Sequence, residues 1–288
     1  MARELDDIRE RSRRVWDAMA AGWETRREDL WRFSRPASEW LVERVDPRPG
    51  QTILDLAAGV GDTGLLAARR LAGTGRVLVT DFAPGMVAAA RRRAAELGVT
   101  NAEFRELDAE RMALESQSVD GVLCRWGYML MPDPGAAFGE TYRVLRPGGR
   151  LAFSVFGPPE RNPWASVVGR ILVAGGHMAP PAPTAPGIFA LSDPKRVHEL
   201  LSQAGFAAPE MAEMPLSWHF HGADDYWWFL REMAGAISPV LQGLDPEAQA
   251  QVRARIVEMT QPFRSSDGYA FPALCVNVST HRPSAQAG

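Results

Sequence analysis

A short apolar run that ends in a glycine-rich turn is the feature that most constrains the fold of this chain. Residues 53–64 are Ile-Leu-Asp-Leu-Ala-Ala-Gly-Val-Gly-Asp-Thr-Gly, and a segment compatible with a helix follows. A second apolar run, residues 77–79, leads to Asp81. In open α/β sheets, such glycines let the backbone approach a ligand, and an acid at the next strand end accepts ribose hydroxyls. The pattern predicts a site for a nucleoside cofactor.

The type of cofactor is a separate question, because Gly59-x-Gly61-x-x-Gly64 also fits a dinucleotide fingerprint or a merely flexible turn. Asp55 stands in the strand just before the glycines, where its charge would repel a diphosphate. It would instead suit a cationic ligand that carries an ammonium and a sulfonium. An NAD(P)-dependent oxidoreductase is therefore the less favoured alternative, and the acid at Asp108 also argues against it.

The segment 55–62, Asp-Leu-Ala-Ala-Gly-Val-Gly-Asp, resembles motif I of the class I S-adenosylmethionine (SAM)-dependent methyltransferases. The nearest variant is that of the ubiquinone/menaquinone-biosynthesis-type methyltransferases and related small-molecule methyltransferases. The resemblance covers roughly residues 45 to 157. It implies SAM as cofactor and S-adenosyl-L-homocysteine (SAH) as product. Segments that resemble the later motifs are 80–86, 107–110, 119–125 and 143–150.

The resemblance also implies which residues bind the cofactor. Asp81 would accept the ribose hydroxyls, Asp108 would take the adenine amino group, and Met86 would lie near the adenine. Arg125 and Trp126 would line the site from the fourth strand end, although a structural salt bridge is an alternative role for Arg125. The complete predicted set is Asp55, Ala57, Gly59, Gly61, Asp81, Phe82, Met86, Asp108, Ala109, Arg125 and Trp126.

Strand-like and helix-like segments alternate from residue 51 to residue 156, which is typical of a parallel sheet with helices on both faces. With the resemblance, this predicts an α/β, Rossmann-like class I methyltransferase fold. We expect a seven-stranded, mostly parallel sheet, N-terminal helices, and a helical lid inserted before the last strand. The expected strands lie near 52–57, 76–81, 102–107, 119–125, 149–156, 209–220 and 274–280.

The domain organisation follows from the same pattern. We expect an N-terminal helical cap (1–46) and a SAM-binding core (47–157, continued by 193–222 and 271–282). A Pro/Gly-rich excursion over the site (158–192) and a helical lid (223–270) complete the chain.

Catalytic residues are harder to predict, because an activated methyl donor needs mainly in-line positioning of the acceptor. The fourth strand end, Cys-Arg-Trp-Gly-Tyr at 124–128, lacks the Asn/Asp-Pro-Pro-aromatic motif of enzymes that methylate amino groups of nucleic acids and protein glutamine. This favours O- or C-methylation of a small molecule. Candidate bases or substrate contacts are His219, His221 and Tyr128. For each of them a packing or surface role is the alternative.

Aromatic residues indicate where a flat, apolar substrate would bind. Residues 226–230 are Tyr-Trp-Trp-Phe-Leu, and five consecutive apolar residues exceed one face of a helix. We therefore expect Trp227 and Trp228 to face a substrate pocket or a partner chain in a homodimer, unless they only pack onto the domain. Trp23 joins this predicted pocket because the stretch 20–31 is expected to fold over the cofactor.

Composition excludes several classes of partner. A net charge of −3 provides no electrostatic basis for binding nucleic acid or an anionic membrane. The two cysteines, Cys124 and Cys275, lie in apolar runs and predict buried thiols, so no metal site is expected. Without a signal peptide or a run of ~18 apolar residues, the protein is expected to be cytoplasmic.

These observations favour a SAM-dependent methyltransferase that acts on an apolar or aromatic small molecule, and we expect this molecule to belong to specialised metabolism. Two alternatives stay open. One is a protein that keeps SAM or SAH while its pocket does other chemistry. The other is a binding protein on an inactive fold, which the intact acids Asp55, Asp81 and Asp108 disfavour.

Overall fold

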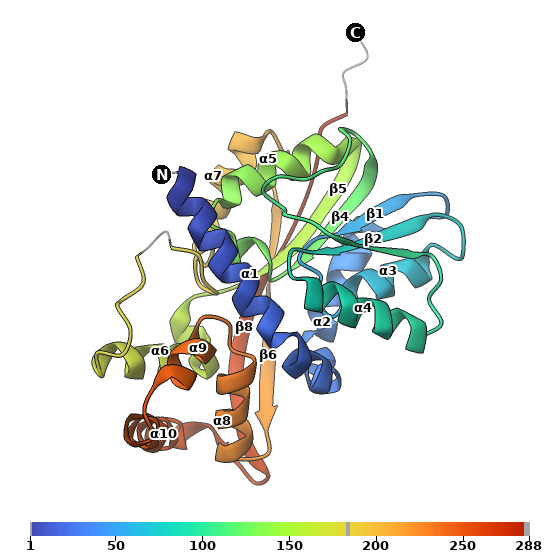
Figure 1. Ribbon diagram of the computed structural model, residues 1–288. Helices are drawn as coiled ribbons and strands as arrows, with labels where there is room; N and C mark the ends of the chain where they lie inside the picture. Colours follow the sequence, from blue (N-terminus) through green and yellow to red (C-terminus); the bar gives the residue numbers. More distant parts are fainter. Residues whose placement is uncertain (1, 183–184, 285–288) are drawn as a thin grey trace.

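The computed structural model describes residues 2–182 and 185–284, and it confirms the predicted fold class. One sheet has the strand order β3-β2-β1-β4-β5-β8-β6 (Figure 1). Residues 183 and 184 of the predicted excursion, and residue 1 of the predicted cap, lie outside the described part. The strands are β1 (Thr52–Asp55), β2 (Arg76–Asp81), β3 (Ala102–Glu106), β4 (Val119–Arg125), β5 (Leu145–Phe156), β6 (Glu210–Phe220) and β8 (Gly268–His281), with the two-residue β7 (Arg264–Ser265) paired to β8.

The first five strands pair in parallel, whereas β8 runs antiparallel to both of its neighbours, β5 and β6. Alternate side chains of the parallel strands enter two separate cores. Ile53 and Val79 pack with α2 and α3, while Leu54 and Phe153 pack with α5 and α7 on the other face. The carboxyl ends of the parallel strands therefore form one edge, where ligands bind in sheets of this kind.

The helices are those expected between the strands, with two differences described below. Those that flank the sheet are α2 (Arg27–Val45), α3 (Asp62–Arg70), α4 (Pro84–Glu96), α5 (Pro134–Val144) and α7 (Pro194–Ala204). The others are α1 (Ala2–Thr25), α6 (Pro163–Ala174), α8 (Ala223–Glu232), α9 (Ile237–Gly243) and α10 (Pro246–Met259). Among the described residues, no helix is both long and apolar enough to cross a membrane.

The predicted N-terminal helical segment is broken at Arg26, whose backbone (φ −103°, ψ 18°) is not helical. The first piece, α1, packs along α4 and crosses the front of the molecule in Figure 1. The second piece, α2, contains Pro36 in its interior and packs under β4, β5 and β8. These contacts place both helices beside the strand ends that carry the predicted motifs.

The segment between β6 and β8 carries α8, α9 and α10, which gather with α6 at one end of the β6–β8 pair (Figure 1). The short helix α9 was not expected from the sequence. The last strand also begins at Gly268 rather than near residue 274, because Tyr269 pairs with Phe220 at the tip of a long β6–β8 ladder. The additional strand residues include Tyr269 and Phe271, which the sequence pattern did not place in a strand.

Candidate functional site

The glycine-rich turn after β1 has the sharp backbone that the sequence predicts. Ala57, Gly59 and Gly61 all have positive φ angles, of 49°, 56° and 87°. A side chain at Gly61 would lie 2.9 Å from Cβ of Ala90, so glycine is required there by space as well as by conformation. The turn leads directly into α3, so the first backbone amides of this helix lie just after the end of β1.

Asp55, at the end of β1, supports this turn and retains one free oxygen. Its Oδ2 accepts a hydrogen bond of 2.7 Å from the Gly64 amide. Its Oδ1 is buried and has no hydrogen-bond partner among the described residues. Burial raises the pKa of Asp55 to about 7. A buried, unpaired carboxylate oxygen of this kind is suited to a cationic ligand.

Asp81, at the end of β2, holds the neighbouring loop. Its Oδ2 accepts from the Gly59 amide at 2.9 Å, and its Oδ1 accepts from the Ala83 amide at 3.0 Å. Burial raises the pKa of Asp81 to about 6. This carboxylate therefore shapes the glycine turn, and its remaining lone pairs are available to ligand hydroxyls.

Arg125, at the end of β4, lies beside the same turn and is 9% exposed. Its Nε donates to Oγ1 of Thr63 at 3.1 Å, and Thr63 in turn contacts the Ser38 hydroxyl at 2.9 Å. Burial lowers the pKa of Arg125, and the nearby carboxylates of Asp62 and Asp55 partly oppose this change. Arg125 thus joins β4 to the first turn of α3, without a direct salt bridge to either acid in the described structure.

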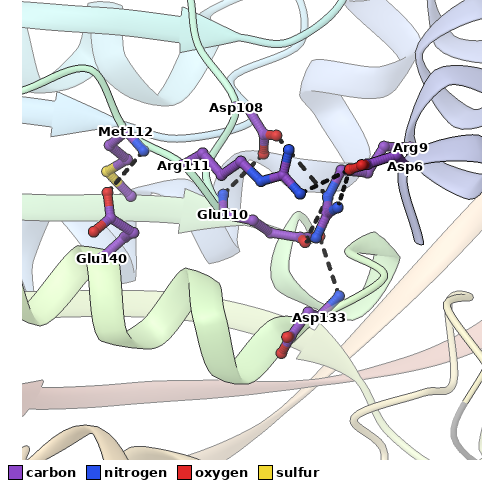
Figure 2. Close-up of polar contacts among 8 residues, drawn as sticks. All are labelled: Asp6, Arg9, Asp108, Glu110, Arg111, Met112, Asp133 and Glu140. Carbon is purple, nitrogen blue, oxygen red and sulfur yellow. Dashed lines mark hydrogen bonds and ion pairs between the residues drawn. The ribbon is translucent and has the colours of Figure 1, made fainter. Parts of the chain in front are cut away.

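Asp108 and Glu110, after β3, connect three parts of the chain (Figure 2). Asp108 accepts from the Glu110 amide at 2.9 Å and lies 4.0 Å from the guanidinium of Arg9 in α1. Glu110 accepts from Arg9 and, at 3.1 Å, from the amide of Asp133, the residue that caps α5. Burial raises the pKa of Glu110 despite its pairing with Arg9. The predicted adenine-binding acid therefore lies next to α1, with its side chain 38% exposed.

The helix α1 also makes an apolar contact with the glycine turn. Met19 and Ala20 of α1 pack with Val60 and Met86 in a small core of their own. Asp17 of α1 accepts a 2.6 Å hydrogen bond from the amide of Gly85 at the start of α4. Of the other predicted cofactor residues, Phe82 lies partly buried at the margin of this contact, and Met86 and Ala109 are buried.

Trp23 of α1 also lies beside the glycine turn. Its indole Nε1 donates to the backbone oxygen of Met233 at 3.3 Å, and its ring packs edge-on against Trp16. A Cβ added to Gly59 would lie 3.6 Å from the Trp23 ring. The structure therefore places Trp23 over the glycine turn, and its role in a substrate pocket stays a prediction.

Beyond the carboxyl ends of β4 and β5, seven large aromatic side chains meet. Trp126 begins this set directly after Arg125, and it has a φ of 61°, which is unfavourable for a bulky residue. Its ring stacks on Phe156 with 4.8 Å between ring centroids. We name the set the aromatic cluster; its members are Phe33, Trp126, Phe156, Trp164, Trp218, Phe220 and Phe229.

Tyr128 does not reach either region, which corrects its prediction as a catalytic residue. Its side chain is fully buried and stacks on Phe138. Its hydroxyl is 2.7 Å from Oγ1 of Thr141 in α5, and burial raises its pKa well above the ordinary value. The 3-10 turn at residues 128–130 directs the side chain into the core between the sheet and α5.

The two histidines lie on the surface. His219 alternates along β6 with the buried Trp218 and Phe220, so its exposed side chain points to the opposite face of the strand. The strand ends at Phe220, and His221 is an exposed turn residue whose amide donates to Asp225 at 2.9 Å. The two histidines therefore do not share one strand face, and His219 also borders a small cavity lined by Trp218 and Phe229.

The helix α8 buries Tyr226, Phe229 and Leu230, and it leaves Trp227 and Trp228 half-exposed. Trp227 borders a surface hollow beside Arg253. Trp228 stacks under the guanidinium of Arg26, 4.9 Å from its ring centroid, at the mouth of a small cavity. Trp228 thus lines this cavity together with the buried Phe229, and a substrate-pocket role for Trp227 and Trp228 stays a prediction.

Sequence reasoning did not identify Glu110 or most of the aromatic cluster. Glu110 stands within the segment 107–110 that resembles the third motif, and its position two residues after Asp108 was an available signal. Phe33, Trp164 and Trp218 come from separate elements, so nothing in their local sequence indicates that they meet. Among the described residues, no group of three or more His, Cys, Asp or Glu side chains could hold a metal ion.

Comparisons with known proteins agree with this geometry. A family model described as a methyltransferase domain matches residues 53–149. Nocamycin O-methyltransferase from Saccharothrix syringae is 30% identical over 246 residues, which cover 78% of this chain and 83% of that protein. Demethylmenaquinone methyltransferase from Thermus thermophilus is 38% identical over 136 residues, or 47% of this chain, and the chain spans only 59% of that relative.

A solved structure shares the fold over most of this chain. It is phosphoethanolamine N-methyltransferase 2 from Haemonchus contortus in complex with SAM, with a TM-score of 0.54 and 18% sequence identity. The superposition covers 86% of this chain and 53% of that one. At this level of identity the likeness concerns the fold alone.

Proposed function

The chain belongs to the SAM-dependent methyltransferases, and we propose that it methylates an oxygen or carbon atom of an apolar, aromatic small molecule. The observation that carries the cofactor assignment is the unpaired Oδ1 of Asp55, buried beside a turn of positive-φ residues. Asp55 would hold the positively charged end of SAM, the glycine turn would pack against it, and Asp81 would accept the ribose hydroxyls. Asp108 would bind the adenine amino group once Arg9 makes room for it.

When bound, SAM supplies a methyl group that its positively charged sulfur makes electrophilic. The residues of the chain then have to hold the acceptor in line and exclude water, which together can lower a barrier by about 7–11 kcal/mol. The aromatic cluster is buried, and its Trp126 ring lies under the Arg125 guanidinium. Tyr128 and His221 do not line this place, and His219 only borders the small cavity beside it with an exposed side chain, so positioning rather than a histidine base is the favoured mode of catalysis.

The nature of the acceptor rests on two arguments. The strand end at 124–128 lacks the motif of enzymes that methylate amino groups of nucleic acids and protein glutamine, and the surrounding side chains are aromatic. The relative from Saccharothrix syringae is named as an O-methyltransferase, and the one from Thermus thermophilus as a methyltransferase of demethylmenaquinone. Both names are compatible with an aromatic or apolar acceptor, and they leave the choice between oxygen and carbon open.

Several predictions about the whole protein stay predictions. These are the five segment boundaries, a lid role for residues 223–270, dimerisation through the exposed aromatic side of α8, and a cytoplasmic location. A protein that keeps SAM or SAH for other chemistry is the alternative, because it would need the same cofactor turn as an enzyme that transfers the methyl group.

Methyl transfer from isotopically labelled SAM to a metabolite extract tests the proposal. We expect label in a small molecule that partitions into organic solvent, and mass spectrometry then distinguishes O- from C-methylation. The Asp55→Asn variant is the control for label that does not depend on the site. Tight SAM binding without any labelled product would favour the non-methylating alternative.

A further inference from the structure

We propose that Phe33 plugs a substrate slot within the aromatic cluster, and that a planar, fused-ring substrate binds by taking the place of the Phe33 ring. The proposal rests on the proposed function, because it assigns the acceptor to the region beside the cofactor turn. It names a binding site and a class of ligand that differ from the pocket predicted around Trp227 and Trp228.

The Phe33 ring occupies the centre of the aromatic cluster. It stacks on Trp218 with 3.9 Å between centroids and an interplanar angle of 20°. It also lies 5.4 Å from Trp126, 6.3 Å from Trp164 and 6.5 Å from Phe156. These are distances at which aromatic rings attract one another. One side chain from α2 therefore fills a space bounded by four other rings, each contributed by a different part of the chain.

Two buried N–H donors in the rings around this space have no partner among the described residues. They are Nε1 of Trp218 and Nε1 of Trp126, both in rings that contact Phe33. Their residues are 5% and 8% exposed. Buried donors without acceptors are rare in folded proteins and indicate an absent partner. A phenol or carbonyl oxygen at the edge of a planar ring would provide an acceptor for these donors.

The part of α2 that carries Phe33 is attached weakly on its carboxyl side. Pro36 has no backbone N–H, so the carbonyl of Arg32 lacks its usual helical hydrogen bond. On the other side, Arg26 precedes the helix and pairs with Asp225 of α8. The missing hydrogen bond makes Pro36 the position at which residues 27–35 would tilt relative to the rest of α2.

A route to the slot lies next to these residues. A cavity of about 20 Å³, enough for one water molecule, lies there. Its lining includes Leu30, Trp218, Phe229, Arg26, Trp228 and the predicted His219. Tilting the first turns of α2 would join this cavity to the space held by Phe33. A ligand that enters there meets Trp126, whose strained φ of 61° keeps its ring at the end of β4 next to Arg125.

Calorimetric titration with 2-naphthol, in the presence of saturating SAH, tests the slot without any need for turnover. Decahydro-2-naphthol is the matched probe, because it has the same carbon skeleton and hydroxyl group but is not planar. We expect Phe33→Ala to bind 2-naphthol about five-fold or more tightly than the unchanged protein, since no ring must be displaced. Phe33→Leu, which retains more core volume, should show a smaller gain in the same direction.

The control variant is Phe206→Ala. Phe206 is 7% exposed, compared with 5% for Phe33, and packs edge-on against Tyr142 away from the cluster. It should lose similar stability and leave 2-naphthol binding unchanged. If both Phe33 variants bind SAH normally but bind 2-naphthol no better than the unchanged protein, or if they bind the saturated probe equally well, the slot is refuted. If the unchanged protein does not bind SAH at all, the proposed function is refuted instead.

Discussion

Arg9 and Glu110 are 101 residues apart in the chain, yet the Arg9 guanidinium donates from both Nε and Nη2 to Oε2 of Glu110 (Figure 2). The Glu110 side chain is 2% exposed, so this pair is largely shielded from solvent. It attaches the first turns of α1 beside Asp108, at the end of the predicted adenine site. We therefore expect this part of α1 to slow the exchange of a nucleoside bound there.

Replacing Arg9 by alanine should therefore accelerate SAM dissociation several-fold, because the attachment of α1 is lost. It should also lower the free energy of unfolding by about 1–3 kcal/mol, since Glu110 is left buried without its partner. Stopped-flow fluorescence and urea denaturation measure the two effects. Arg13→Ala is the matched control on the same helix, because Arg13 pairs with the nearby Glu10 at the surface. Equal effects of the two variants would contradict a special role for Arg9.

The buried charge of Asp55 should destabilise the protein without ligand at neutral pH. Its pKa is raised from 3.8 to about 7, so the folded state holds a proton that the unfolded state has already released. Stability must therefore fall as the pH rises from about 4 to about 7, and it should change little through this group above that range.

The Asp55→Asn variant removes this effect. At pH 8 we expect it to raise the free energy of unfolding by up to about 4 kcal/mol, and near pH 4 to have little effect. Urea denaturation across this pH range is the measurement. A variant that is equally destabilised at both pH values would show that the hydrogen bond to Gly64 outweighs the buried charge.

SAM binding should have the opposite pH dependence. A cationic ligand and its ribose hydroxyls require ionised Asp55 and Asp81, whose pKa values are about 7 and about 6. We expect affinity to be about 10–100-fold weaker at pH 5.5 than at pH 8, with proton release on binding near neutral pH. Calorimetry in two buffers of different ionisation enthalpy measures both quantities. In Asp55→Asn the remaining dependence should be small and centred near pH 6.

The residues that sequence could identify are those that act through a contiguous stretch of chain. Asp55 and Asp81 were predicted because each follows an apolar strand at a fixed distance from the glycines, and the backbone contacts of both lie within that local frame. The aromatic cluster could not be predicted, because it requires the relative placement of α2, β6 and α8. His219 faces outward because it alternates along β6 with the buried Trp218 and Phe220, and this period of two was a local signal that could have shown it.

Tyr128 should be dispensable for catalysis. Because its hydroxyl contacts only Thr141 in the core, Tyr128→Phe should leave kcat and KM within about twofold of the unchanged enzyme. The lost hydrogen bond should lower the free energy of unfolding by about 0.5–1.5 kcal/mol. Steady-state kinetics and urea denaturation check the two parts. A large loss of kcat at unchanged stability would restore the catalytic assignment.

Gly64 provides the sharpest test of the cofactor turn. It lies in the first turn of α3, where its conformation is helical, so an alanine there would be favoured by propensity alone. Space forbids it: an added Cβ would lie 2.6 Å from Oδ2 of Asp55 and 3.1 Å from Cγ2 of Val79. Gly64→Ala should therefore displace Asp55, weaken SAM binding at least about tenfold, and destabilise the fold by about 1–3 kcal/mol.

The control variant is Gly139→Ala in α5, where a Cβ meets nothing within 4 Å. It should stabilise the protein by about 0.5–1 kcal/mol and leave SAM binding unchanged. Normal SAM affinity in a folded Gly64→Ala variant would show that the position of Asp55 does not determine cofactor binding.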